Sequence, residues 1–372
     1  MQKIDQRLLG QVTALGNKEV ECIVYLTDLK HLESFDRECR VIKTFEFINA
    51  VGVKAGIQSI QNLALNDYIK YITVNSMVSV QVAKAKDVMN LQALYDEDLT
   101  GQGVCVAVID TGISPLLDFC MPQNRIKHFL DLVNNEKFPY DDNGHGTFIS
   151  GVLLGNGLVS GRKYAGIAPQ ADIVSIKALD SNGESGAFRV LEAMEWIYKH
   201  YKEFNIKVVC MSFGSEPLPK DDPLVNGAEM LWKAGITVVV AGGNSGPSNN
   251  TIKSPGVSSR VITVGGLDDG REDGVFKVAD FSSRGPAGFI YKPDILAPST
   301  NIVSNNKELI DGKGYTTMSG TSVATPMIAG VACLLYQKYP NARPDEIKNY
   351  ILRRGHRLNL SRNEEGFGWF MA

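Results

Sequence analysis

The sequence predicts an α/β protein whose main part is a mostly parallel sheet with helices on both faces, preceded by a small α+β domain. From about residue 98 onward, unbroken apolar runs alternate with longer segments of helical spacing, as in a parallel sheet with crossover helices. Before residue 80, the candidate elements follow the order strand, helix, two strands, helix and strand. The 372 residues, 44% of them hydrophobic, are enough for one large domain or two.

The first domain is expected over residues 1–80. Its segment 57–65 repeats apolar residues at helical spacing, whereas 68–74 alternates like a strand. The expected elements are strands over 20–27, 41–49, 51–55 and 68–74, a weak helix over 28–38 and a helix over 57–65. This order predicts a small ferredoxin-like fold. A linker is expected near residues 75–90, and the second domain is expected over 81–372.

The second domain alternates strands and helices. The expected strands cover 104–109, 172–178, 207–213, 236–241 and 261–265, and the expected helices cover 146–154, 186–203, 223–234 and 322–339. Functional side chains of open α/β sheets lie at the carboxyl ends of the parallel strands. Residues that directly follow these strands are therefore the first candidates for a site.

The stretch Gly-Thr-Ser-Val-Ala-Thr-Pro, residues 320–326, is the most informative for function. It places Ser322 at the start of the apolar run 323–339, which is expected to be a buried helix. Backbone N–H groups and the helix dipole favour negative charge there, which suits a nucleophile whose reaction builds an oxyanion. Taken alone, a serine in this position is more typical of an ordinary helix N-cap.

Two further candidates lie upstream. Asp110 follows the apolar strand 104–109 at its carboxyl end, and His145 stands between two glycines in Asp-Asn-Gly-His-Gly-Thr, residues 142–147. The glycines let the backbone approach closely and leave the imidazole free to face a cleft. The simpler interpretations are an aspartate that caps a turn and a histidine in a surface turn.

Asn244 follows a buried strand and two glycines, where its side-chain amide can donate to a developing oxyanion. By itself, this Asn-Ser-Gly would indicate a β-turn. The order of Asp110, His145 and Ser322 along the chain is that of one version of the Asp-His-Ser triad. The four residues together therefore predict nucleophilic catalysis by serine.

With these motifs, the chain resembles the subtilisin-like (S8) serine proteases, and within them the bacterial intracellular alkaline proteases. The resemblance is close over about 98–340 and loose before it. The other blocks that carry it are residues 140–147, 168–169, 211–214, 222–225, 254–257, 261–265, 281–286 and 292–298. The chain departs from the family at Phe148, Gly242 and Val323, where histidine, alanine and methionine are common. None of these three positions supplies a catalytic group.

The resemblance implies a serine endopeptidase that works through an acyl-enzyme. Ser322 would be the nucleophile, His145 the general base and acid, and Asp110 the group that orients the imidazole. Asn244 and the backbone N–H of Ser322 would form the oxyanion hole.

The resemblance also implies how a substrate would bind. An extended peptide would add as a strand to two edges, Ser185-Gly186-Ala187 and Ser212-Phe213-Gly214, which are otherwise an ordinary turn and strand end. Lys253 precedes Ser254-Pro255-Gly256, and in the family the residue before this element lies at the base of the S1 pocket. A lysine there would favour Asp or Glu at P1, unless it points to solvent and leaves an apolar pocket.

For the N-terminal domain, the resemblance implies a propeptide that assists folding and inhibits the protease by laying its tail in the cleft. Cleavage is then expected near Val78–Ser79. An unrelated binding module is the alternative for this domain. For the whole chain, the alternatives are a propeptide-locked pseudoprotease or regulatory binding protein, and a non-peptidase hydrolase. The intact candidate residues argue against the first, and the two peptide-binding edges argue against the second.

Composition narrows the partners and the compartment. A net charge of −3 without a long Lys/Arg cluster argues against nucleic acid, and no apolar stretch approaches the length of a membrane span. The start lacks an apolar signal segment, and the six cysteines lack disulfide or zinc spacing, so a cytoplasmic location is expected. The expected partners are a peptide or protein substrate and the chain's own N-terminal domain.

No cofactor is expected to be required. Calcium is the one candidate, because Asp118 falls where some subtilisins have a calcium ligand. The nearby segment 155–164 does not supply the oxygen ligands that this hard cation needs. Asp118 is otherwise a turn residue.

Overall fold

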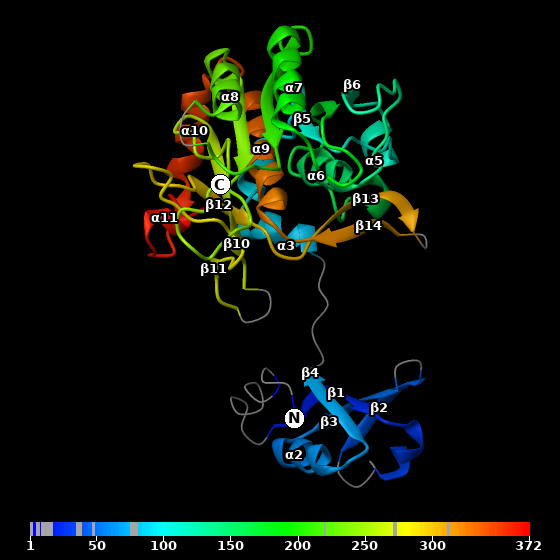
Figure 1. Ribbon diagram of the computed structural model, residues 1–372. Coiled ribbons are helices and arrows are strands. Elements are labelled where there is room, and N and C mark those ends of the chain that lie inside the picture. The colour runs from blue at the N-terminus through cyan, green and yellow to red at the C-terminus, as the bar shows by residue number, and fades with distance from the viewer. Residues whose placement is uncertain are drawn as a thin grey trace. The chain divides into compact units, whose positions relative to one another are not determined.

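The computed structural model describes residues 3–4, 8, 18–34, 39–46, 49–74, 81–218, 221–270, 274–310 and 313–372. The chain forms two compact units, Met1–Ser79 and Val80–Ala372. Figure 1 labels their elements. Residues 75–80, which contain the cleavage point expected near Val78–Ser79, lie outside the described residues.

The first unit contains an antiparallel four-stranded sheet in the order β2-β3-β1-β4. Its elements are β1 (Val20–Leu26), the 3₁₀ helix η1 (Leu29–Ser34), β2 (Arg40–Phe45), β3 (Ala50–Ala55), α2 (Ile57–Leu65) and β4 (Ile69–Val74). Alternate residues of β1, from Val20 to Leu26, are buried in one cluster with Ile60 and Leu63 of α2. The period of two in the strand therefore sets which face of the sheet α2 covers. The weak helix expected over 28–38 is a short 3₁₀ helix in its described part.

The second unit is built on a ten-stranded sheet with a parallel centre. Neighbouring strands run parallel through β12-β10-β9-β8-β5-β7-β6, whereas β11 and β15 pair antiparallel at β10 and β16. The strands are β5 (Cys105–Asp110), β6 (Ile126–Asp131), β7 (Asp172–Lys177), β8 (Ile206–Met211), β9 (Thr237–Ala241), β10 (Ile262–Asp268), β11 (Lys277–Val278), β12 (Ile295–Pro298), β15 (Gly355–His356) and β16 (Trp369–Phe370). A separate hairpin pairs β13 (Ile302–Ile310) with β14 (Lys313–Met318).

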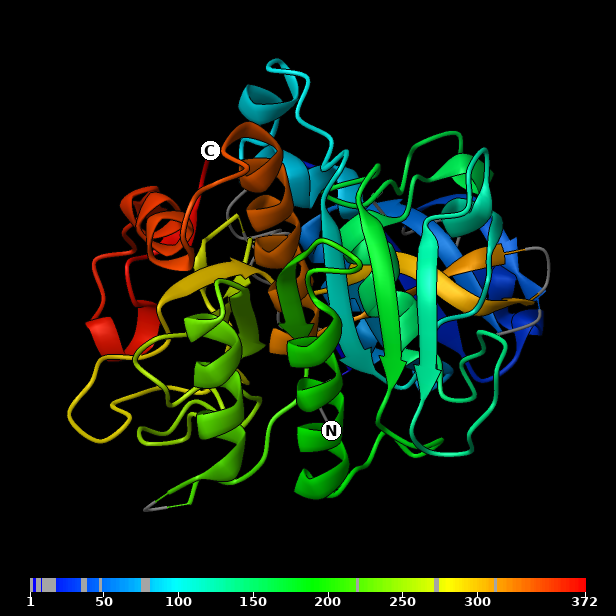
Figure 2. The ribbon, with the colours of Figure 1, turned by 90° about the horizontal axis from the view of Figure 1, so that it is seen from above.

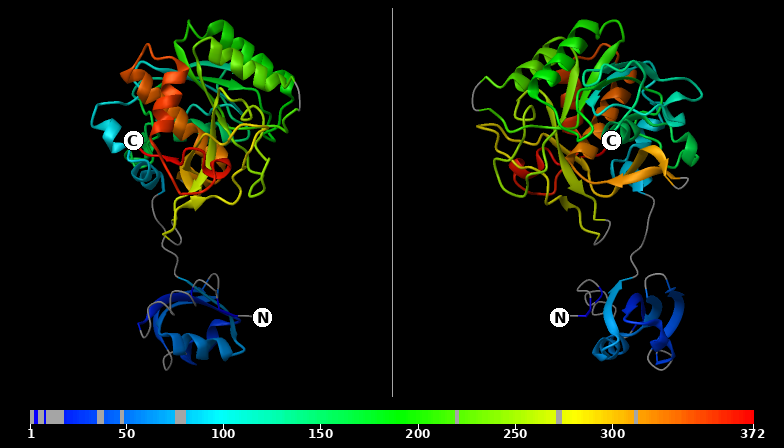
Figure 3. Two further views of the ribbon diagram at one scale, coloured as in Figure 1. Left: turned by 90° about the vertical axis from the view of Figure 1, so that its left-hand side faces the viewer. Right: turned by 45° about the vertical axis from the view of Figure 1, so that its right-hand side comes forward.

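Helices cover both faces of this sheet. The long helices are α6 (His145–Leu154), α7 (Ala187–His200), α8 (Pro223–Lys233), α9 (Thr321–Lys338) and α10 (Pro344–Arg353). The shorter ones are α3 (Gln81–Val88), α4 (Gln92–Tyr95), α5 (Leu117–Cys120), η3 (Leu158–Ser160) and α11 (Arg362–Glu365). Helices α7 and α8 pack side by side on one face, and α6 and α9 pack together on the other (Figure 2). Two further views show the same layers (Figure 3).

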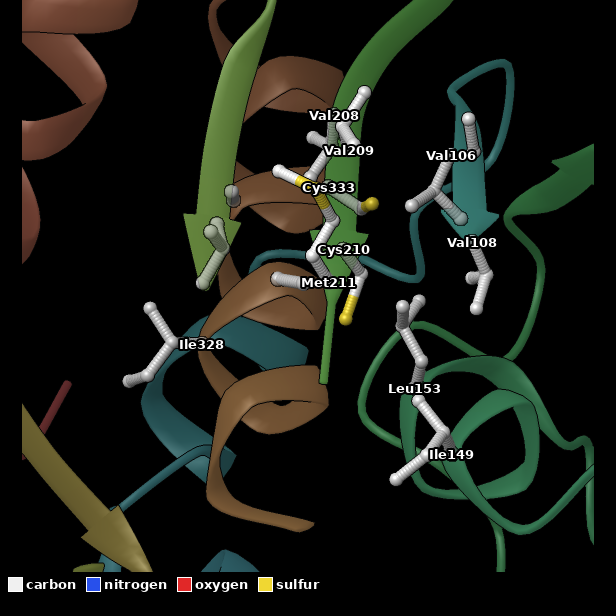
Figure 4. Close-up of a cluster of buried hydrophobic side chains, with 14 of the residues drawn as sticks. Val106, Val108, Ile149, Leu153, Val208, Val209, Cys210, Met211, Ile328 and Cys333 are labelled. Carbon is white, nitrogen blue, oxygen red and sulfur yellow. The ribbon is translucent and has the colours of Figure 1, made fainter. Parts of the chain in front are cut away.

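The core of the second unit fills the space between these layers. Figure 4 shows part of this core, with Cys210 of β8, Ile328 and Cys333 of α9, and Ile149 and Leu153 of α6. Residues 323–336 of α9 are all buried, so this helix is enclosed on every side. Cys22, Cys105, Cys210 and Cys333 are buried, and burial raises the pKa of the Cys210 thiol to about 12. These thiols therefore act as core residues.

The segment expected to be a linker near 75–90 differs from the expectation in its second half. Residues 81–88 form α3, and Ala85 and Met89 are buried in the core of the second unit. Apolar residues spaced by four place one face of this short helix against the core, which composition alone did not reveal. Among the helices in the described ranges, none is long and apolar enough to cross a membrane.

Candidate active site

The predicted site residues converge because three neighbouring parallel strands end at one edge of the sheet. Asp110 is the last residue of β5, Ser212 follows β8, and Asn244 comes three residues after β9. Strand β8 pairs with β5 on one side and with β9 on the other. The three chain segments therefore leave the sheet side by side at its carboxyl edge.

Asp110 and His145 are hydrogen-bonded. Asp110 Oδ1 lies 2.7 Å from His145 Nδ1, and it also accepts a bond of 2.8 Å from the backbone N–H of Thr111. The carboxylate is 1% exposed, whereas a quarter of the imidazole (25%) faces solvent. Because an ionised carboxylate only accepts, Nδ1 carries the proton in a neutral imidazole, and Nε2 keeps its lone pair.

The electrostatics of this pair favour the charged imidazole. Burial lowers the pKa of His145, but the charge of Asp110, the hydrogen bond to it and the charge of Asp141 together raise it above 6.5. Asp110 Oδ2 is buried and has no hydrogen-bond partner in the described part of the chain. The carboxylate therefore has spare capacity to stabilise an imidazolium.

The loop that carries His145 is held by Asp141. Its carboxylate accepts hydrogen bonds from Thr111 Oγ1 at 2.9 Å, Gly144 N at 2.7 Å and Thr147 N at 2.8 Å. Gly144 has a φ of 108°, a left-handed conformation that suits glycine. This buried aspartate thus ties the segment after β5 to the first turn of α6, where His145 begins the helix.

Ser322 and Asn244 come together at the start of α9. A Cβ built on Gly320 would lie 3.1 Å from Ser322 Oγ and 3.2 Å from Asn244 Nδ2, so both groups adjoin this glycine. Asn244 Oδ1 accepts bonds of 2.8 Å from Thr321 N and 3.0 Å from Thr321 Oγ1. Because this atom accepts from two donors, it is the amide oxygen, and the other terminal atom of the amide is the nitrogen. Its Nδ2 has no acceptor among the described residues and can donate to another group.

Ser322 and His145 lie in the first turns of two helices, α9 and α6, that pack against each other. Within the described ranges, no hydrogen bond joins Ser322 Oγ to His145 Nε2. Such bonds are often long before substrate binds and tighten in the reacting complex. The structure thus brings Asp110 into direct contact with His145, and Ser322 next to Asn244.

The two expected peptide-binding edges flank this region. Phe213 and Gly214 lie past the end of β8, where strand pairing has stopped at Met211, and Gly214 is exposed. The other edge, Ser185-Gly186-Ala187, lies at the start of α7, where Ser185 is half-buried and Gly186 and Ala187 are exposed. The turn before it is fastened to the histidine loop, because Asn143 Nδ2 donates to Ser181 O at 3.0 Å.

Lys253 is packed between two glycines of the site. A Cβ on Gly214 would lie 2.7 Å from Lys253 Cβ, and a Cβ on Gly243 would lie 2.5 Å from Lys253 Cγ. Its Nζ forms an ion pair with Glu216. The lysine side chain is 17% exposed and that of Glu216 is 82% exposed. Sequence reasoning did not find Glu216, since nothing in the order of residues links it to Lys253.

Asp118 does not have the surroundings of a metal ligand. It is buried, and its carboxylate accepts hydrogen bonds from Val159 N at 2.9 Å, Asn305 Nδ2 at 2.8 Å and Tyr315 Oη at 2.5 Å. Burial and the bond to Asp118 raise the pKa of Tyr315, which keeps its proton on the phenol. In the described ranges, no cluster of three His, Cys, Asp or Glu residues is placed to bind a metal. The residues around Asp118 therefore do not fit calcium.

The chain belongs to the subtilase family, because the family model Peptidase_S8 matches residues 101–369. Among curated relatives, serine protease AprX of Bacillus subtilis (strain 168) is 42% identical over 322 residues, which cover 80% of this chain and 69% of AprX. The thermostable alkaline protease of Halalkalibacterium halodurans is 31% identical over 322 residues, which cover 86% of this chain and 80% of that protein.

Solved structures agree with this family. A structure described as the S41 psychrophilic protease has a TM-score of 0.66 at 30% identity, covering 76% of this chain and 97% of the other. A cold-adapted subtilisin-like serine proteinase has a TM-score of 0.60 at 27% identity, covering 74% and 90%. The predicted family and the α/β fold class are confirmed. The protein is a subtilisin-like serine endopeptidase that acts on peptides or proteins, and subtilases need no organic cofactor.

Proposed function

We propose that Asp110, His145 and Ser322 form the catalytic triad of this endopeptidase and that Asn244 supplies a donor of its oxyanion hole. The observation that carries the proposal is the 2.7 Å bond between Asp110 and His145 at the sheet edge where Asn244 also emerges. The free Nδ2 of Asn244 beside the Ser322 hydroxyl supports the assignment of the oxyanion donor.

Acylation follows from these positions. Ser322 Oγ attacks the carbonyl carbon of the scissile bond while His145 Nε2 takes the hydroxyl proton. Asn244 Nδ2 and the backbone N–H of Ser322 donate to the tetrahedral oxyanion. The C–N bond then breaks as the imidazolium returns its proton to the leaving amine. Asp110 holds Nδ1–H and stabilises the imidazolium throughout.

Deacylation repeats the same steps with water. His145 Nε2 removes a proton from a water molecule, whose oxygen attacks the acyl carbon. The second oxyanion occupies the same donors, and its collapse breaks the ester bond. The proton on the imidazolium passes to Ser322 Oγ, so the product acid leaves and the hydroxyl is restored.

Substrate is proposed to bind as an added strand along Ser212–Gly214 and Ser185–Ala187, with Lys253 beside the side chain that precedes the scissile bond. Because Lys253 Nζ is already paired with Glu216, an acidic P1 side chain must displace that carboxylate. An apolar P1 side chain leaves the ion pair intact. The exposure of Glu216 makes the exchange inexpensive in desolvation, which supports selectivity for acidic P1 residues.

The test of selectivity compares kcat/KM for matched peptides with Glu, Leu or Phe at P1. We expect Glu216→Gln to raise the Glu/Leu ratio, because the lysine then has no competing partner, and Lys253→Met to abolish any preference for Glu. A preference for Leu or Phe in the wild type that Glu216→Gln leaves unchanged would exclude acidic selectivity.

The first unit is proposed to be the propeptide and intramolecular inhibitor, with a cytoplasmic location for the whole enzyme. Support comes from the compactness of this unit and from its own buried cluster, which includes residues of β1 and α2. A unit with its own core can fold as a separate domain, and domain boundaries are common sites of cleavage.

The experiment that tests the function follows the intact mass of the full chain over time, beside Ser322→Ala, while casein hydrolysis is assayed. We expect the wild type to lose roughly residues 1–80 and to hydrolyse casein, and Ser322→Ala to do neither. If both proteins stay at full length and inert, the first unit is a standing inhibitor or the chain is a regulatory binding protein. Hydrolysis that persists in Ser322→Ala would overturn the assignment of the nucleophile.

A further inference from the structure

Lys177 is a buried lysine beside the proposed triad. It is the last residue of β7, its side chain is 0% exposed, and its register partner in the neighbouring strand is Asp110. Burying an ammonium group is costly unless its protons are all satisfied. A side chain of similar volume without charge would pack there at lower cost, so the charge itself needs an explanation.

The ammonium group uses all three of its protons. Nζ donates to Thr111 O at 2.8 Å, to Asp142 Oδ1 at 2.6 Å and to Leu179 O at 3.1 Å. It also lies 5.2 Å from the centre of the Tyr140 ring, over its face. One group thereby joins the segment after β5, the loop before α6 and the end of β7.

The acceptors are what makes this arrangement informative. Thr111 directly follows Asp110, and Asp142 lies three residues before His145. The ion pair of Lys177 and Asp142 therefore helps to connect the two backbone segments that carry Asp110 and His145, whose side chains are joined by the 2.7 Å bond. Asp141 bridges the same segments through Thr111 Oγ1, but it carries no positive charge.

We propose that Lys177, with Asp142 as its partner, is a positioning residue that sets the distance between Asp110 and His145 and balances the charge around them. This inference rests on the proposed roles of Asp110 and His145. Lys177 does not touch the reacting atoms, and it acts through the two segments that it joins.

The charge balance gives the proposal a measurable consequence. The charged groups that face His145 or its loop come from β5, the loop before α6, β7 and β13, and they are Asp110, Asp141, Asp142, Lys177 and Lys307. Removing Lys177 leaves the carboxylates in excess and favours the imidazolium, which moves the acid limb of kcat/KM to higher pH. Removing the charge of Asp142 has the opposite sign.

The experiment uses the protease matured from the full chain, with Lys177→Met, Asp142→Asn and the double variant. We expect Lys177→Met to lower kcat by about 10- to 100-fold and to change KM much less. Misplacement of Asp110 and His145 by a fraction of an ångström to about 1 Å reduces the stabilisation of the transition state. Its acid limb should move up by roughly half a pH unit. The limb of Asp142→Asn should move down, and that of the charge-balanced double variant should return toward the wild-type position.

Lys292→Met is the matched control. Lys292 is also buried, and its Nζ donates to Thr263 Oγ1 at 2.8 Å, Asp294 Oδ2 at 2.6 Å and Val261 O at 3.3 Å. These partners lie at the amino end of β10 and β12, the sheet edge opposite the site. Lys292→Met should change the melting temperature but leave kcat and the acid limb unchanged, as expected for a structural lysine.

The outcomes separate this inference from the proposed function. Equal losses of kcat in Lys177→Met and Lys292→Met, or an acid limb that moves in neither Lys177→Met nor Asp142→Asn, would overturn it. If Lys177→Met does not fold, Asp142→Asn decides the question, because its side chain is 32% exposed and the substitution keeps its size. A wild type whose hydrolysis survives Ser322→Ala would instead overturn the triad.

Discussion

Substitution of Gly146 by alanine tests the geometry of the Asp110–His145 pair directly. A Cβ built on Gly146 lies 2.2 Å from the carbonyl oxygen of Gly112 and 3.2 Å from Asp110 Cβ. Non-bonded carbon and oxygen atoms repel strongly at 2.2 Å. The first turn of α6 must therefore move by roughly 1 Å away from the segment after β5. The displaced backbone is the one that carries His145.

A retreat of this size carries His145 Nδ1 and Asp110 Oδ1, now 2.7 Å apart, out of hydrogen-bonding range. Misplacement of a catalytic group by about 1 Å costs on the order of 100-fold in rate. Overpacking also lowers the free energy of unfolding by about 1–3 kcal/mol. We therefore expect Gly146→Ala to lower kcat/KM by about 100-fold while the protein remains folded.

Gly151→Ala is the matched control on the same helix. Its Cβ would lie 2.3 Å from Ser304 Oγ and 2.4 Å from Asn305 Oδ1, an overlap of similar size that faces β13 and not the segment after β5. Both variants are assayed for kcat and KM on a peptide substrate and for melting temperature by calorimetry. The reasoning is refuted if Gly146→Ala keeps wild-type kcat, or if Gly151→Ala loses as much kcat for the same loss of melting temperature.

Four other predictions follow from the structure. Asn244→Asp keeps the Oδ1 acceptor for Thr321 but loses the N–H donor of the amide. We expect kcat to fall by about 10²- to 10³-fold with little change in melting temperature. A small loss of kcat would exclude Asn244 as an oxyanion donor. The pKa of His145 lies above 6.5, and the base must be neutral, so the acid limb of kcat/KM should have its midpoint above pH 6.5; a midpoint below that value would contradict the pairing with Asp110. EDTA should leave the melting temperature unchanged, because protein donors satisfy Asp118, and a clear drop on chelation would show a metal site elsewhere. Burial lowers the pKa of Lys292 from 10.5 to about 8, so between these two pH values the unfolded chain binds a proton that the folded chain has lost. This group therefore raises the free energy of unfolding of the wild type as pH rises from about 8 to 10.5. Denaturant unfolding of Lys292→Met should lack that contribution.

The central strands could be predicted because burial on both faces leaves an unbroken apolar run. The starts of β5, β7, β8, β9 and β10 lie within one residue of the expected positions. Strand β6 was not predicted, since it lies at the sheet edge and carries Lys127 and His128, which interrupt the apolar pattern. The hairpin of β13 and β14 was missed for a related reason, because polar residues such as Ser304 and Asn305 occupy its buried positions.

The convergence of Asp110 and Asn244 could be predicted because both follow parallel strands, whose carboxyl ends meet at one edge. The buried charged groups that hold the segments of the site in place could not be predicted. Asp141 and Lys177 are residue types whose ordinary place is the surface, and only the fold shows them buried. The pairing of Lys253 with Glu216 was equally hidden, because it depends on the path of the chain after β8 and not on a motif.

The two buried lysines, Lys177 and Lys292, have similar hydrogen-bond partners but different roles in this fold. Lys177 and Lys292 each satisfy three acceptors that include one aspartate, so both resolve the cost of a buried charge in the same way. The acceptors of Lys292 belong to the starts of two paired strands, which the sheet ladder already holds together. Two of the acceptors of Lys177 belong to segments that, among the described residues, are paired through the isolated bridge between Gly112 and Asp141 and not through a sheet ladder. A buried charge therefore adds most to function where backbone pairing is sparse, as it is at the carboxyl edge of this sheet.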